Sequence, residues 1–188
     1  DGAPDKVMNI QIKKDKNKGF FGRATAGYGT QDRYQASFNG NYFNITLLFI
    51  NRSTQDYVGL FGILVGNISN IGLININISG HSGVGGLVGE SRGIIFNSFS
   101  TGNVRGFSVI GGLIGQFSGT IISSFSTGNV SSSSDYAGGL VGAQNSGIIS
   151  KSYSMANVNL VSGYYAGGLV GQFSGTIISS FSTGNVSS

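Results

Sequence analysis

The sequence contains no cysteine and no tryptophan, has one proline, and has few charged residues, which make up 10% of its 188 positions. Without cysteine the chain has neither a disulfide framework nor a thiolate metal site. No stretch reaches the roughly 18 apolar residues of a membrane span, so no membrane span is expected. The single histidine, His81, lies in a Gly-His-Ser-Gly loop without a second ligand, so we expect no metal and no other cofactor.

Acidic residues are too sparse for a paired acid and base. From Val58 onward the only carboxylates are Glu90 and Asp135. One follows a Gly-Gly pair and the other precedes one, so a regular repeat would place them in different columns. The many serines have no basic partner that could activate a nucleophile. We therefore expect the chain not to be an enzyme.

Positive charge is concentrated near the N-terminus. The formal net charge is +4, and residues 1–33 hold seven basic against four acidic side chains. The local cluster Lys13–Lys18 is interpreted as a solvated turn in preference to a phosphate-binding patch. Aromatic and basic residues do not alternate along the rest of the chain, so no nucleic-acid partner is expected.

Glycine is abundant, with 33 residues, and it marks an internal repeat. The segment Gly111–Ser132 recurs as Gly167–Ser188 with only Ile114 changed to Val170. A Gly-Leu-x-Gly signature returns about every 26 to 29 residues, and units this short indicate a solenoid. The positions predicted to build the repeat are Gly86, Leu87, Gly89, Gly112, Leu113, Gly115, Gly139, Leu140, Gly142, Gly168, Leu169 and Gly171.

The repeat unit favours strands over helices, because it is rich in Gly, Ser, Asn and β-branched residues and has no apolar pattern of helical period. Within residues 121–127 a period of two would place Ile121, Ser123, Phe125 and Thr127 on one face. Gly128-Asn129 predicts a turn. About three short strands per unit would form one coil, and successive coils would pair in parallel.

The sequence therefore predicts an all-β fold, a parallel β-helix of about five repeats with a β-rich N-terminal cap. Residues 1–57 are expected to form the cap and lead-in strands, with a strand at Val7–Ile12, and residues 58–188 the repeats, in one continuous structural domain. The length of each unit varies only at 105–110, 131–137 and 159–166, which predicts outward loops on a rigid coil.

The repeats resemble the GLUG motif, found in tandem in bacterial surface adhesins and near immunoglobulin A peptidases. The likeness rests on Gly-Gly-Leu-Val-Gly, on the following Gly-x-Ile-x-x-Ser-Phe/Tyr-Ser, and on Thr-Gly-Asn-Val at Thr101–Val104, Thr127–Val130 and Thr183–Val186. Upstream, Phe38–Leu47 resembles the lead-in strand of such arrays. The resemblance covers roughly residues 38–188 and implies an exported protein, extracellular or at the cell surface.

Stacking of coils would align equivalent side chains into columns. One column is aromatic, and we interpret it as core stacking, with a platform for sugar rings as the alternative: Phe99, Phe125, Tyr153 and Phe181. Serine columns beside it are expected to hydrogen-bond between coils. The predicted loops carry the aromatic residues that we select as partner contacts: Phe107, Tyr136, Tyr164 and Tyr165.

Three functions remain open from the sequence. The first is a non-catalytic segment of a cell-surface adhesin, with a host or neighbouring-cell surface protein or glycan as partner. The second is a subunit of an extracellular filament, in which further copies stack end to end, because the sequence stops at Ser188 with the repeat still in phase. The third is a passive stalk beside a peptidase or other enzyme domain.

Overall fold

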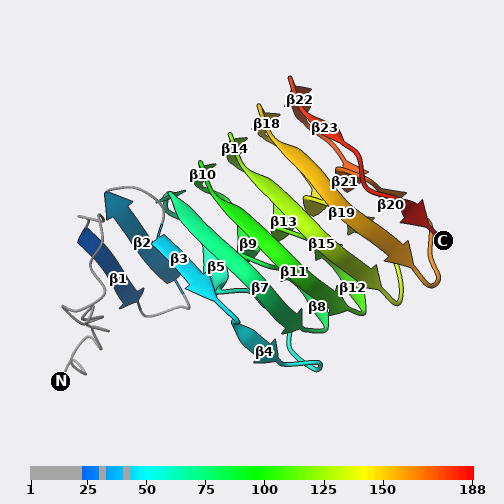
Figure 1. Cartoon of the computed structure of the whole chain (residues 1–188), viewed down its shortest axis with the longest axis horizontal. Coiled ribbons are helices and arrows are strands. Elements are labelled where there is room, and N and C mark those ends of the chain that lie inside the picture. The colour runs from blue at the N-terminus through cyan, green and yellow to red at the C-terminus, as the bar shows by residue number, and fades with distance from the viewer. Residues whose placement is uncertain (1–22, 30–32, 40–42) are drawn as a thin grey trace.

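The fold is a parallel β-solenoid in a computed structural model that describes residues 23–29, 33–39 and 43–188. Those residues contain strands and no helix, as the sequence predicts. The coils stack along the long axis of the molecule, and equivalent strands of successive coils lie side by side from the N-terminal to the C-terminal end (Figure 1). The predicted parallel β-helix is therefore confirmed.

A complete coil contributes strands to four different sheets, so the prediction of about three strands per unit is wrong. The seven-stranded sheet contains β1 (Arg23–Gly29), β2 (Arg33–Asn39), β5 (Phe61–Leu64), β9 (Val88–Ser91), β13 (Ile114–Phe117), β17 (Val141–Gln144) and β21 (Val170–Phe173). The five-stranded sheet contains β6 (Ile68–Ser69), β10 (Ile94–Phe96), β14 (Thr120–Ile122), β18 (Ile148–Ser150) and β22 (Thr176–Ile178).

The longest strands form the eight-stranded sheet, whose broad face is turned toward the viewer in Figure 1. Its members are β3 (Phe43–Thr46), β4 (Phe49–Asn51), β7 (Ile71–Ser79), β11 (Phe99–Gly106), β15 (Phe125–Ser132), β19 (Tyr153–Leu160), β23 (Phe181–Ser182) and β24 (Val186–Ser187). The four-stranded sheet closes each coil with β8 (Ser82–Gly85), β12 (Ser108–Gly111), β16 (Ala137–Gly138) and β20 (Ala166–Gly167).

The N-terminal end of the stack is bordered by a hairpin. Strand β1 pairs antiparallel with β2, and β2 pairs parallel with β5 through Arg33 and Ile63. Strands β3 and β4 pair in parallel with β7, so parallel stacking starts N-terminal to Val58. The predicted strand Val7–Ile12 and the cluster Lys13–Lys18 lie outside the described residues.

A sharp corner separates the five-stranded from the eight-stranded sheet. One residue of each coil adopts a positive φ of 47° to 59° there, at Asn70, Asn97, Ser123, Lys151 and Ser179. The strand before the corner and the strand after it belong to different sheets. The alternation of inward and outward side chains therefore does not continue across the corner. Ile121 is buried while Phe125 points outward, so the predicted single face from Ile121 to Thr127 is wrong.

Two serine columns point inward beside this corner. The backbone N–H of Ser98 donates to the hydroxyl of Ser124 at 3.1 Å, and Ser124 repeats that contact with Ser152. In the second column the hydroxyl of Ser126 donates to the carbonyl of Gly139 in the next coil at 2.5 Å. Buried hydroxyls are therefore satisfied mostly by backbone groups of neighbouring residues and coils, which ties each coil to the next.

The predicted turn at Gly128-Asn129 is wrong, because both residues lie inside β15. Gly128 has a φ of 112° and stacks on Gly102 of β11, so closely that a side chain would overlap the Gly102 carbonyl. The glycine is therefore required by the close approach of two coils and by its positive φ, and not by a reversal of the chain.

Aliphatic side chains fill the interior as one column. Leu87, Leu113 and Leu140, each the leucine of a Gly-Leu-x-Gly signature, are fully buried. In the last described coil the equivalent positions are more open. Ile177 is 37% exposed, whereas Ile149 in the preceding coil is 0% exposed. Each coil is therefore buried by its neighbours rather than by its own fold.

Candidate functional site

The long axis of the solenoid carries a ridge of short connections between the eight-stranded and four-stranded sheets. Three of them contain the aromatic residues predicted to contact a partner, and we call residue 107 with 133–136 and 161–165 the loop edge. The first connection is shorter than expected, because β11 and β12 leave only Phe107 between them. The later two widen to 133–136 and 161–165, as their sequence lengths predict.

Phe107 is stacked on one side and open on the other. Its ring lies parallel to that of His81, with centroids 5.2 Å apart and an interplanar angle of 1°, and the residue is 51% exposed. In the next coil its place is taken by Ser133, because Gly106 pairs in register with Ser132. Serine is too small to cover the phenyl ring, so a flat apolar face remains accessible to a ligand.

The three tyrosines gather at the C-terminal half of the loop edge. Tyr136 stacks on Tyr165 with ring centroids 5.2 Å apart, and Tyr164 meets Tyr165 edge to face at 6.4 Å. The carboxylate of Asp135 accepts a hydrogen bond from the backbone N–H of Tyr164 at 3.2 Å. Tyr164 is nevertheless 86% exposed, so its phenol is held out into solvent.

A second aromatic row lies on the outer face of the eight-stranded sheet. The rings of Phe99, Phe125, Tyr153 and Phe181 stack in succession with centroids 4.8 to 5.2 Å apart. All four are at least partly exposed, and none belongs to the buried cluster. The interpretation of this column as core is therefore wrong, because the corner before each ring turns it outward.

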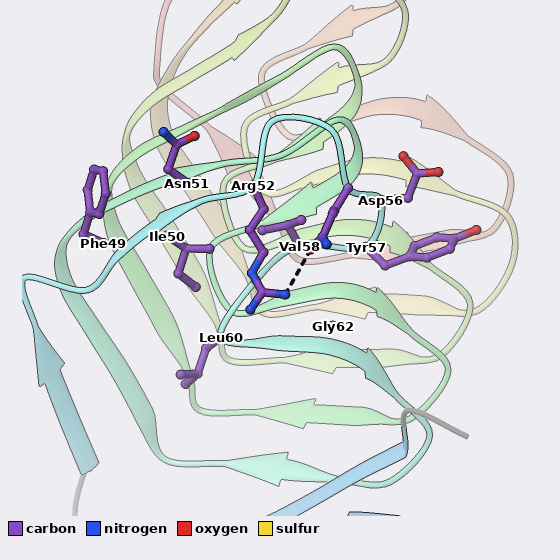
Figure 2. A pocket seen from close by; sticks show the side chains of 11 residues that line it. Phe49, Ile50, Asn51, Arg52, Asp56, Tyr57, Val58, Leu60 and Gly62 are labelled. Atoms are coloured by element: carbon purple, nitrogen blue, oxygen red, sulfur yellow. Dashed lines mark hydrogen bonds between the residues drawn. The ribbon is translucent and has the colours of Figure 1, made fainter. Parts of the chain in front are cut away.

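A hollow of about 440 Å³ lies over the first coil and is lined entirely by residues of one segment, 49–62. Figure 2 shows the Arg52 side chain extending into it between Ile50 and Val58, while Phe49 and Tyr57 stand at opposite sides. Arg52 donates to the amide oxygen of Gln55 at 3.0 Å. Sequence reasoning did not find this hollow, because most of its residues precede the first Gly-Leu-x-Gly signature, at residues 59–62.

A second hollow of about 420 Å³ adjoins the loop edge. It is lined by Arg105 and Phe107 together with three serines, Ser53, Ser131 and Ser133. The Nε of Arg105 donates to the hydroxyl of Ser79 at 2.8 Å, and Ser79 is 6% exposed. Sequence reasoning selected Phe107 and missed Arg105, although Arg105 is one of three basic residues after Val58.

The two carboxylates of the array, Glu90 and Asp135, lie on different elements. Glu90, on β9, forms an ion pair with Arg92 at 2.7 Å, whereas Asp135 belongs to the loop edge. His81 has an acidic neighbour that the sequence reading missed, since its Nδ1 lies 2.8 Å from the carboxylate of Asp56. Among the described residues no three His, Asp or Glu side chains gather closely enough to hold a metal ion.

The fold and this surface define a class of protein: a β-solenoid of short glycine-rich repeats with aromatic residues along one loop edge. No known protein family profile matches the chain. A Bacteroides ovatus protein, whose crystal structure is described as that of a proposed immunoglobulin A1 protease, is similar in fold with a TM-score of 0.66 and 26% identity. The likeness covers 76% of this chain and 49% of that one.

Two curated proteins share shorter stretches. One, provisionally named a Gly-rich membrane protein of Evansella cellulosilytica, is 38% identical over 71 residues. The other, halomucin of Haloquadratum walsbyi, is 37% identical over 75 residues. The matches span only 8% and 1% of the length of these relatives. In the described part of the present chain, no helix has the length and apolarity to cross a bilayer.

Proposed function

We propose that this chain is a non-catalytic binding segment of an extracellular or cell-surface protein, built of GLUG-type repeats. The observation that carries the proposal is the exposed aromatic loop edge, in which Tyr164 is 86% and Phe107 51% exposed. Aromatic side chains that are grouped and open to water mark interaction sites more often than isolated ones do. A rigid stack presents them along one ridge, where a polymer or a large surface can contact several at once.

The chemistry of the array supports binding over catalysis. Glu90 is held by Arg92, and Asp135 accepts the Tyr164 amide on another part of the coil. Hydrolysis of a glycosidic bond requires a pair of facing carboxylates, whereas in the described array Glu90 lies on β9 and Asp135 on the loop edge. The name of the Evansella relative describes a membrane protein, which supports display at a cell surface. The expected partner is a host or neighbouring-cell surface protein or glycan.

The proposal is tested by binding the purified chain to a printed array of glycans and extracellular-matrix proteins. Replacing Tyr164 and Tyr165 together with alanine is expected to weaken the strongest interaction about tenfold or more, because buried aromatic anchors dominate interfaces. Phe96→Ala is the matched control, since Phe96 is 43% exposed but lies in the five-stranded sheet. An array without any bound spot, or binding that survives the double substitution, contradicts the proposal.

A second candidate, end-to-end assembly, is favoured by the last described coil. Val186 is 45% exposed there, whereas Val158 at the equivalent position of the preceding coil is 1% exposed. A further coil, whether it continues the same protein or is supplied by another copy, would bury such side chains and pair the open backbone edge. The likeness to the Bacteroides ovatus protein supports the third candidate, a stalk beside an enzyme domain, because only 49% of that chain is matched.

A further inference from the structure

We propose that the hollow beside the loop edge binds a carboxylated sugar residue of an acidic polysaccharide, with Arg105 as the carboxylate contact and Phe107 as the ring platform. This inference rests on the proposed binding function and names its ligand class. The hollow, of about 420 Å³, is large enough for a single sugar ring and brings a cation, an aromatic face and hydroxyls together.

The guanidinium of Arg105 is oriented before any ligand arrives. Its Nε donates to Ser79 at 2.8 Å, and the nine-tenths burial of Ser79 fixes that anchor point. No acidic side chain among the described residues lies within ion-pair distance of Arg105. The two terminal nitrogens thus provide the planar pair of donors that matches a carboxylate.

The charge of Arg105 stands alone in its row of the sheet. The neighbouring positions in register are Ser79 and Ser131, followed by Asn159 in the next coil, and all are neutral. An anion at Arg105 therefore meets no acidic side chain from the adjacent strands of the eight-stranded sheet. Of the described carboxylates on the loop side, Asp56 already contacts the His81 ring and the Ser82 N–H, and Asp135 accepts from the Tyr164 N–H.

The ring of Phe107 explains why a sugar suits this site better than a small inorganic anion. His81 covers one face of the ring, and the residue remains 51% exposed, since a small residue, Ser133, takes its place in the next coil. A pyranose presents one face of C–H bonds that packs on such a ring. Ser131 and Ser133 line the same hollow, and their hydroxyls are the kind of group that pairs with sugar hydroxyls.

The test measures binding of the whole chain by calorimetry to three carboxylated probes: oligogalacturonate, a hyaluronan oligosaccharide and an α2,8-linked oligosialate. Each probe has its carboxyl methyl ester as a neutral partner of the same ring. At least one acid is expected to bind at least about tenfold more tightly than its ester, because a charge-assisted bidentate pair is lost in the ester. Added salt is expected to weaken binding of the acid more than binding of the ester.

Substitutions locate the binding. Arg105→Gln is expected to lower the affinity for the acid about tenfold and to leave the affinity for the ester unchanged. Phe107→Leu, which keeps apolar bulk but removes the flat ring, is expected to weaken both acid and ester several-fold. Lys151→Gln removes the same charge from a corner elsewhere on the coil. It is expected to change the affinity for neither the acid nor the ester.

The inference is overturned if none of the acids binds, if acid and ester bind equally, or if Arg105→Gln binds the acid like the unaltered chain. A preference for sulfated or phosphorylated probes that lack a carboxylate also overturns it. If the array experiment still shows binding that depends on Tyr164 and Tyr165, the proposed function stands while this ligand class fails. If the chain binds nothing on the array, both the proposed function and this ligand class are contradicted.

Discussion

Replacing Gly112 with alanine is expected to lower the free energy of unfolding by about 3 kcal/mol, near the upper end of overpacking costs. Gly112 is buried where two coils meet, and a methyl group there would overlap the carbonyl oxygen of Gly139 and press on Ser126. Those are the atoms that hold the two coils together, because the same carbonyl accepts hydrogen bonds from Gly112 and Ser126. Urea unfolding followed by circular dichroism measures the loss.

The chain supplies its own control for this substitution. Gly168 occupies the same place in the nearly identical repeat, but a methyl group there meets the side chains of Ser182 and Val186 and no backbone. Side chains in this exposed coil can move aside, so Gly168→Ala is expected to cost no more than about 0.5 kcal/mol. Equal losses for the two substitutions would contradict the account of the glycine as a spacer between coils.

Gly168→Ala also separates the binding segment from the filament. A further coil stacked on this end would place a carbonyl where Gly139 places its own over Gly112. The added methyl group would then block assembly while leaving the single chain folded. Sedimentation that shows concentration-dependent association of the unaltered chain, lost in Gly168→Ala, would favour end-to-end assembly.

Phe117→Ala is expected to lower the free energy of unfolding by roughly 3–5 kcal/mol. Phe117 is the largest fully buried side chain among residues 43–188 and fills the column between Ser91 of one neighbouring coil and Gln144 of the other. Both of these neighbours are polar and fully buried. Truncating the ring would therefore leave a cavity that adjacent apolar side chains cannot simply fill.

The equivalent residue of the second repeat again provides the comparison. Phe173 has the same local sequence as Phe117 but is 49% exposed. With about half of its surface already in water, Phe173→Ala is expected to cost on the order of 1 kcal/mol. Thermal or urea unfolding of both variants tests this, and a cost at Phe173 as large as that at Phe117 would show that burial by the next coil is not what sets the stability.

Repetition made the coil predictable from the sequence. The spacing of Gly-Leu-x-Gly signatures gives the length of a coil, and the position of each loop follows from where that length varies. The inward position of Leu113 and the outward position of Tyr164 follow from the same pattern. These features depend on the period alone, which the sequence shows directly.

The corners were not predictable from the pattern of apolar residues. Ser123 has a φ of 51°, a conformation that a serine does not signal, and it shifts the alternation by turning the chain into another sheet. Phe125 therefore points out and Ser126 points in, against the usual preference of these residue types. The buried serine is stabilised by the carbonyl of Gly139, a partner 13 residues away.

Only part of the candidate binding surface could be predicted from the sequence. Exposed aromatics in variable loops identified Phe107 and Tyr164, whereas the contribution of Arg105 depends on register. Only the pairing of β11 with β7 places Ser79 beside Arg105 and gives the guanidinium its anchor. A single basic residue in a repeat carries no signal by itself, because basic residues usually lie in water without a partner.

Hydroxyl-radical footprinting of the chain, alone and bound to its strongest ligand from the array, tests most directly whether the loop edge is the functional surface. The account predicts that binding protects Phe107, Tyr136, Tyr164 and Tyr165 from oxidation and leaves Phe96 and Phe181 as reactive as in the free chain. Protection of Phe99, Phe125, Tyr153 and Phe181 with unchanged loop tyrosines would contradict it and transfer the binding surface to the eight-stranded sheet.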